Sequence, residues 1–202
     1  MAWIALSVYV AFLVLAFGVR VVLHLRRTGR SGLHGPSGSP GSTEWLAGVL
    51  FVVALVLGAA APVLDLTGSL EPLEPLDGTA GHVAGIVLAG AGVLVTFAAQ
   101  GAMGASWRIG VDERERTELV TGGPFALVRN PIYAAMIPTS VGLALLVPNV
   151  LALVAVAALA LALELQTRLV EEPHLLESHG SSYADYAARV GRFVPGVGRL
   201  RT

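Results

Sequence analysis

The chain has 202 residues, of which 54% are hydrophobic and only 13% charged, and its formal net charge at pH 7 is −1. Soluble domains carry about 25% charged residues, so this composition excludes an ordinary soluble globule, a disordered tail and a nucleic-acid-binding protein. The sequence contains no cysteine, which excludes a disulfide framework, a thiol nucleophile and a zinc–thiolate site. We therefore expect an all-α integral membrane protein.

Five stretches are apolar enough to span a membrane, which takes about 20 residues for each helix. Three nearly uncharged runs predict the first three spans, at residues 2–25, 45–64 and 83–107. A fourth run is too long for one helix and contains the turn-forming pair Pro148-Asn149, so we predict a helical hairpin of residues 132–147 and 150–169. A cleaved signal peptide is the alternative for the first run, but its length and the arginines that follow it favour a span.

Arginine supplies all 13 basic residues, and its distribution among the loops orients the spans. The loops after the first and third spans and the C-terminal tail contain arginines, whereas the loop after the second span carries only acidic residues. Because arginine-rich loops stay in the cytoplasm, we expect the N-terminus outside and the C-terminus in the cytoplasm. Arginine without lysine, with abundant alanine, glycine and valine, indicates a GC-rich genome, so we expect a bacterial inner (plasma) membrane.

Several glycines along the third span permit close packing against another helix. They are Gly81, Gly85, Gly90 and Gly92. The pair at 90 and 92 imitates part of a dinucleotide fingerprint but lacks the strand and the third glycine. Glu171 and His174 have a spacing used in di-iron bundles, but the sequence holds no second copy, and we expect no metal site.

Chemistry-bearing residues gather in two segments that we expect on the cytoplasmic face. The first runs from Ser106-Trp107-Arg108 through a charged stretch at 112–118 to a glycine-rich turn. Pro131 follows this turn and predicts the start of the fourth span, because proline is tolerated in a first helical turn.

Arg129 and Tyr133 flank that helix start, four positions apart and therefore on one face. A helix N-terminus beside an arginine attracts carboxylates. The alternative is that Arg129 extends to lipid headgroups and that Tyr133 belongs to the aromatic belt at the membrane surface.

The second segment opens with Glu171 and Glu172, just past the predicted fifth span. Two carboxylates near a helix C-terminus are unfavourable unless they are well solvated or face a cationic partner. Apolar residues and two tyrosines then recur at near-helical spacing, interrupted by Gly180, which predicts one or two amphipathic helices on the cytoplasmic face. The alternative for Tyr183 and Tyr186 is that they anchor these helices at the membrane surface.

Both segments match the pattern of a known family. The first reads Gly-Pro-Phe-x-x-Val-Arg-Asn-Pro-x-Tyr at 123–133, and the second holds Glu-Glu-x-x-Leu-Leu from 171, Gly-x-x-Tyr-x-x-Tyr from 180 and Arg-Phe-x-Pro from 192. The chain thus resembles the isoprenylcysteine carboxyl methyltransferases, which form a wider group with the phospholipid methyltransferases. We divide it into residues 1–105, with the first three spans, and residues 106–202, a methyltransferase-like catalytic region.

The resemblance implies an enzyme that binds S-adenosylmethionine without a Rossmann domain, in a pocket on the cytoplasmic face. Carried over by position, it implies a cofactor pocket formed by Pro124, Phe125, Val128, Asn130, Tyr133, Glu171, Arg192 and Phe193. It implies catalytic roles for Arg129, Tyr133 and Glu172. In this scheme both glutamates face the ammonium or reacting end of the cofactor, Arg129 orients a carboxylate, and Arg192 and Phe193 close the site.

Asn130 departs from the family pattern, which usually has histidine at this position. Asparagine donates and accepts hydrogen bonds but takes up no proton near neutral pH. If this position only holds the cofactor, activity survives. If it acts as a general base, the protein is impaired or methylates a nucleophile that needs no base, such as a carboxylate, which is already ionised at pH 7.

The leading hypothesis is an S-adenosylmethionine-dependent methyltransferase that acts on a lipidic or isoprenoid small substrate. One alternative is an NADPH-dependent membrane reductase of sterol-reductase-like architecture, for which Arg114 and Arg116 are the only candidates to bind a 2′-phosphate. The other is a non-catalytic membrane protein whose motif has decayed at Asn130. We expect membrane lipid and a lipidic substrate as partners, and no nucleic acid.

Overall fold

The computed structural model describes residues 1–29, 31, 38–104 and 118–200, and these residues form an all-α fold. Ser106, Trp107 and Arg108, residues 112–117 and Arg30 lie outside the described residues. Arg114 and Arg116, the candidates to bind a 2′-phosphate, are among them. In the described ranges, backbone pairing between extended segments is limited to one isolated bridge.

The first span is a continuous helix made of α1 (Ala2–Leu13), a π-helical stretch η1 (Val14–Val19) and α2 (Arg20–Thr28). Next come α3 (Thr43–Leu66), whose first turn is capped by the Ser42 hydroxyl, and α4 (Thr79–Met103). These three helices and the one that begins at Val150 are long and apolar enough to cross a membrane.

The predicted helical hairpin is confirmed. It consists of α5 (Pro131–Leu146) and α6 (Val150–Leu165), joined at Pro148-Asn149. The Asn149 side chain is fully buried, accepts a hydrogen bond from the Ala152 amide at 2.9 Å and donates one to the Ala61 carbonyl at 3.3 Å. This asparagine therefore caps α6 and ties the hairpin turn to α3.

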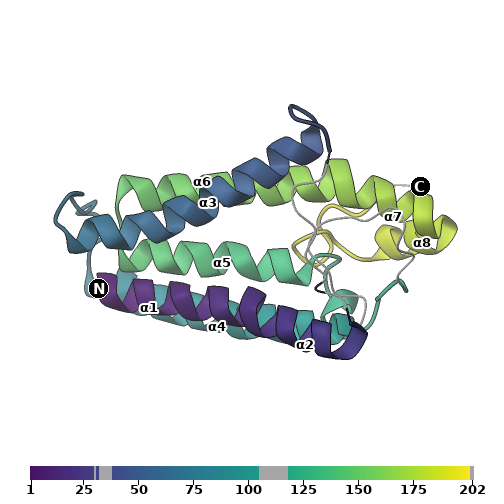
Figure 1. Cartoon of the computed structure of the whole chain (residues 1–202), viewed down its shortest axis with the longest axis horizontal. Coiled ribbons are helices and arrows are strands. Elements are labelled where there is room, and N and C mark those ends of the chain that lie inside the picture. The colour runs from purple at the N-terminus through teal and green to yellow at the C-terminus, as the bar shows by residue number, and fades with distance from the viewer. Residues whose placement is uncertain (30, 32–37, 105–117, 201–202) are drawn as a thin grey trace.

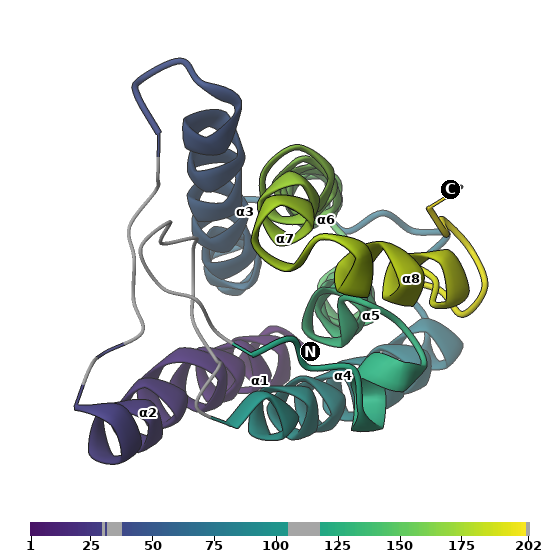
Figure 2. The same cartoon turned by 90° about the vertical axis from the view of Figure 1, so that its right-hand side faces the viewer.

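The helices form two layers with α5 between them. Figure 1 shows α1 and α4 on one side of α5 and α3 and α6 on the other, and Figure 2 shows the same arrangement end-on. The closest packing joins α4 to α5 and α3 to α6. At 16 residues α5 is shorter than the four candidate spans, which have 24 to 30 residues and the last of which extends from Val150 to His179. The position of α5 between the two layers shields it from lipid.

The chain after α6 differs in one respect from the prediction. The helix does not end before Glu171, but continues through the π-helical stretch η4 (Gln166–Glu171) into α7 (Glu172–His179). It stops at Gly180, whose φ is 54°, and α8 (Ser181–Arg189) follows. The predicted end at residue 169 followed the end of the apolar run. Glu172 faces a cationic partner, described below, which is one of the two environments expected for it.

The tyrosines of α8 are core residues. Tyr183 and Tyr186 are 2% and 5% exposed and pack with Ala187, Leu175 and other apolar residues. The alternative interpretation of these tyrosines as membrane-surface anchors is therefore wrong. As a result, α8 is fixed against the end of the bundle where α5 begins, which we call the site end (Figure 2).

Only some of the glycines in α4 serve helix packing. A Cβ on Gly85 would lie 2.7 Å from the Gly142 carbonyl oxygen, and one on Gly92 would lie 2.9 Å from the Ala135 carbonyl oxygen, so α4 and α5 touch through their backbones. Gly90 has nothing within 4 Å of its Cβ position, and the packing role expected for it is wrong.

The α4–α5 contact predicts a stability difference between two identical substitutions. A Cβ on Gly142 would lie 2.5 Å from the Ala89 amide nitrogen, so Gly142→Ala should lower the free energy of unfolding by about 1–3 kcal/mol through overpacking. Gly90→Ala should leave it unchanged or raise it, because alanine favours helix more than glycine does. Thermal unfolding in detergent measures both, and equal melting temperatures for the two variants would contradict the close contact.

Candidate active site

The site begins where the loop before α5 meets the C-terminal segment. A 3₁₀ turn η3 (Gly123–Ala126) leads to Val128, which forms a parallel bridge with Gly191. The Arg129 amide donates to the Gly191 carbonyl at 2.8 Å, and the Asn130 amide donates to the Arg192 carbonyl at 3.1 Å. The two segments that the sequence singles out are thus joined through their backbones.

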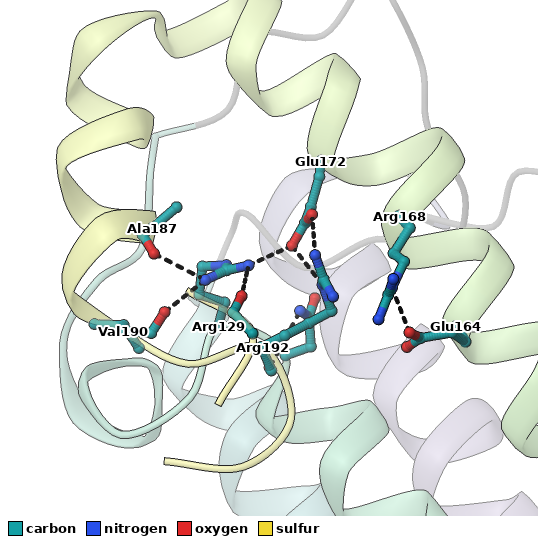
Figure 3. A network of polar contacts seen from close by, with 9 residues as sticks. Arg129, Glu164, Arg168, Glu172, Ala187, Val190 and Arg192 are labelled. Atoms are coloured by element: carbon teal, nitrogen blue, oxygen red, sulfur yellow. Dashed lines mark hydrogen bonds and ion pairs between the residues drawn. The ribbon is translucent and has the colours of Figure 1, made fainter. Parts of the chain in front are cut away.

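The Glu172 carboxylate lies between two arginines. Its Oε1 accepts from Arg129 at 2.5 Å and from Arg192 Nε at 2.8 Å, and its Oε2 accepts from Arg192 Nη2 at 2.8 Å (Figure 3). The Glu172 and Arg129 side chains are 7% and 1% exposed. We call Arg129, Glu172 and Arg192 the ion cluster; two cations and one carboxylate give it a net charge of +1.

Arg129 also binds the C-terminal segment through three backbone carbonyls. Nη1 donates to Ala187 at 3.0 Å and to Val190 at 2.5 Å, and Nη2 donates to Gly198 at 3.1 Å. Ala187 and Val190 lie at the C-terminal end of α8, where a positive charge is favoured (Figure 3). The Arg129 Nε is buried and has no hydrogen-bond partner within the described part of the chain. The sequence-based alternative, that Arg129 extends to lipid headgroups, is wrong.

Tyr133 and Glu171 form a second polar group beside the ion cluster. The Tyr133 hydroxyl donates to Glu171 Oε1 at 2.5 Å, and Gln166 Nε2 lies 3.4 Å from the same oxygen. Tyr133 stands in the first turn of α5 and Glu171 at the end of η4, so the pair bridges the two helices of the hairpin. Gln166 was not predicted, and its only sequence signal is a polar residue one helical turn before the glutamates.

The loop side of the site is held by α8. The Tyr186 hydroxyl donates to the carbonyl of buried Phe125 at 2.6 Å. Burial raises the pKa of Tyr186, and that of Tyr183, to about 12, so both phenols stay protonated and Tyr186 remains a donor at any physiological pH. Hydrogen bonds to Glu172 raise the pKa of Arg192, which keeps this arginine charged.

The remaining predicted residues lie along the same loop and tail. Pro124 stands half-buried in η3, and Val128 is buried at the bridge. The Asn130 side chain donates to the Arg192 carbonyl at 3.4 Å, which adds to the backbone pairing. Phe193 is half-buried beside Arg192. The structure therefore brings all predicted site residues to the site end.

Removing the Glu172 side chain should destabilise the fold, because two arginines would lose the carboxylate that they share. Glu172→Ala should lower the free energy of unfolding by about 3–5 kcal/mol, the cost of breaking a buried ion pair. Glu164→Ala removes a half-exposed partner of Arg168 on the same helix and should cost about 0–1 kcal/mol. Thermal unfolding in detergent compares the variants, and a melting temperature of Glu172→Ala equal to that of Glu164→Ala would show that the cluster does not hold the segments together.

Two curated relatives are similar in sequence to part of this chain. The nickel-cobalt-cadmium resistance protein NccN of Alcaligenes xylosoxydans xylosoxydans is 35% identical over 92 residues, which are 46% of this chain and 43% of the relative. The cobalt-zinc-cadmium resistance protein CzcN of Cupriavidus metallidurans is 34% identical over 91 residues, 45% of this chain and 42% of the relative. Each match spans less than half the length of the relative.

A family model described as phospholipid methyltransferase matches residues 80–182. The match begins in α4, includes the hairpin with Arg129, Tyr133 and both glutamates, and ends in the first turn of α8. It leaves out the tail that carries Arg192, so this part of the ion cluster lies beyond the family match. The family implies a methyltransferase, and the apolar helices indicate that it works in a membrane. Since the match covers more than half of the 202 residues, the chain belongs to the phospholipid methyltransferase family.

Proposed function

We propose that this protein transfers a methyl group from S-adenosylmethionine to a lipidic acceptor at the site end of the bundle. The observation that carries the proposal is the arrangement of Tyr133 and Glu171 directly beside a buried ion cluster of net positive charge. The negative Glu171 carboxylate and the positive ion cluster thus lie side by side at one end of an apolar bundle. The cofactor carries both a carboxylate and positive groups, and the acceptor would approach from the lipid.

The side chains at the site fit this cofactor. Arg129 has a buried Nε–H without a partner among the described residues, in a cluster of net charge +1, which suits a carboxylate. The Glu171 carboxylate suits an ammonium or sulfonium group. Arg129, Glu171 and Tyr133 would therefore hold the cofactor.

When bound, the cofactor supplies an electrophilic methyl group, whose bond to sulfur breaks as a bond to the acceptor nucleophile forms. The chain positions the reactants and excludes water, which is enough to supply much of the rate of an in-line displacement. Tyr133 fixes the orientation of Glu171 by its hydrogen bond, and Glu172 fixes Arg129. In this proposal Glu172 is a positioning residue, and Glu171 rather than Glu172 faces the cationic end of the cofactor.

The presence of asparagine at position 130 favours a methyl acceptor that reacts without a general base. Its side chain faces the Arg192 carbonyl and has no group that can take up a proton near neutral pH. We propose an acceptor that is already ionised, such as a carboxylate, in the inner membrane of a bacterium, with the site end in the cytoplasm. The two relatives are named as metal resistance proteins. Among the described residues of this chain, no three His, Asp or Glu side chains lie close enough together to hold a metal ion. We propose that the region shared with them serves methyl transfer.

Calorimetric titration of S-adenosylhomocysteine into the detergent-solubilised full chain tests the cofactor. We expect micromolar binding, and Glu171→Gln should weaken it about tenfold or more, because the variant loses the negative charge that faces the cationic end. Glu164→Gln, a carboxylate on the same helix that pairs with Arg168, is the matched control and should bind as the wild type does.

Two results of this titration contradict the proposal. Folded wild-type protein that does not bind S-adenosylhomocysteine would show that the motif is not a cofactor site. Binding of NADPH in its place would favour the reductase.

A further inference from the structure

Two valines of the C-terminal tail are exposed at the site end. Val194 and Val197 are 55% and 62% exposed, and among the described residues after η4 no other large apolar side chain is more than half exposed. The tyrosines of α8, by contrast, are buried against the bundle. The tail therefore presents an apolar surface of its own.

The two valines are the ends of a tight turn. The Val197 amide donates to the Val194 carbonyl at 3.0 Å, and Pro195 and Gly196 lie between them. Proline at the second position and glycine with a positive φ, here 78°, at the third are typical of a type II turn. Because the ends of such a turn lie within about 7 Å of each other, the two valines form one small apolar tip, which we call the valine turn (residues 194–197).

The valine turn lies in a basic tail. Four arginines and no acidic residue follow Asp185 in the sequence. Arg192 belongs to the ion cluster, and Arg189 donates to the Asp185 carbonyl. Arg199 is exposed and, within the described part of the chain, has no hydrogen-bond or ion-pair partner. Its Nη2 lies 3.6 Å from the position that a Cβ on Gly196 would occupy, so an uncompensated positive charge stands beside the turn.

The turn lies at the level where α5 begins. The Arg192 amide donates to the Val197 carbonyl at 2.8 Å, and the Arg192 carbonyl accepts from the amide of Asn130, one residue before α5. Figure 2 shows the yellow tail at the rim of the bundle, outside α8. A segment that is outermost in the end-on view and lies beside the first turn of an apolar hairpin helix is next to the membrane surface.

The size and the charge of the valine turn indicate what covers it. Stable protein interfaces bury about 1,200–2,000 Å², which a tip of two valines does not provide. A lipid surface requires only a small apolar tip that enters the headgroup region and a cation that attracts anionic lipid. The planar guanidinium of arginine also binds phosphate through two hydrogen bonds.

We propose that the valine turn and Arg199 bind the surface of an anionic bilayer, with the valines among the lipid headgroups and the Arg199 guanidinium on a lipid phosphate. The Gly198 carbonyl, between the turn and this arginine, accepts from Arg129, so the contact also fixes the position of the ion cluster relative to the bilayer. This lipid contact does not depend on the proposed methyl transfer.

Fluorescence quenching tests the contact. The chain contains no cysteine, so Val194→Cys introduces a unique attachment site for an environment-sensitive fluorophore. The labelled full chain is placed in nanodiscs of phosphatidylcholine alone or mixed equally with phosphatidylglycerol, and is quenched by acrylamide from the water or by doxyl-labelled lipid from the bilayer. We expect phosphatidylglycerol to increase the lipid quenching and to decrease the acrylamide quenching. A label on Ser182→Cys, exposed at the start of α8, should be quenched by acrylamide in both nanodiscs.

A matched pair of charge variants tests the role of Arg199. Arg199→Gln should weaken the lipid contact of the Val194 label about fivefold, the contribution of one arginine near an anionic surface. Arg27→Gln removes the same charge from the last turn of α2, on the opposite side of the bundle in Figure 2, and should leave the contact unchanged. Both arginines are exposed, so both variants should fold.

The other results of these measurements would overturn the proposal. Strong acrylamide quenching of the Val194 label in both nanodiscs would show that the turn lies in water. Equal lipid quenching with and without phosphatidylglycerol, or an unchanged contact in Arg199→Gln, would show that the arginine charge does not bind anionic lipid. Protection from acrylamide without quenching by lipid would show that another protein or a second copy of this chain covers the turn.

Discussion

The site depends on one buried carboxylate, that of Glu172, which two arginines share. Arg129 comes from the loop before α5 and Arg192 from the tail after α8, so the carboxylate joins segments more than 60 residues apart. The Arg129 guanidinium in turn binds carbonyls at the end of α8. Such a cluster is costly to desolvate, and it is stable here because almost every charged atom has a partner. The backbone bridge between Val128 and Gly191 joins the same two segments.

The two adjacent glutamates have different partners because neighbouring helical residues point about 100° apart. Glu172 faces the arginines, and Glu171 faces Tyr133 across the hairpin. One carboxylate therefore holds the structure together, and in the proposed function the other meets the cofactor. The partnerless Arg129 Nε and the surplus positive charge lie beside them. This division of roles is the basis of the proposed cofactor site.

Much of this arrangement is predictable from the sequence. The lengths of the apolar runs and the turn at Pro148-Asn149 are local properties, and the structure confirms them. The expectation that Arg129 and Tyr133 lie on one helix face is wrong, because α5 begins at Pro131 and Arg129 lies in the loop before it. The sequence does not predict that Arg129 and Arg192 bind one carboxylate, because that contact depends on where a tail far along the chain folds back. For the same reason the sequence does not distinguish Gly92, which touches α5, from Gly90, which touches nothing. The continuation of the helix past Glu171 was missed because the span was bounded by the end of its apolar run, whereas the helix extends beyond that run into the polar α7.

The central claim is that the site end transfers a methyl group to a lipid. It is tested most directly by incubating membranes that contain the protein with S-adenosylmethionine labelled in its methyl group and measuring label in the organic extract. The account predicts labelled lipid with the wild type and a loss of that label in Glu171→Gln membranes with equal amounts of folded protein. Equal label in both membranes, or none above the background of membranes without the protein, would contradict it.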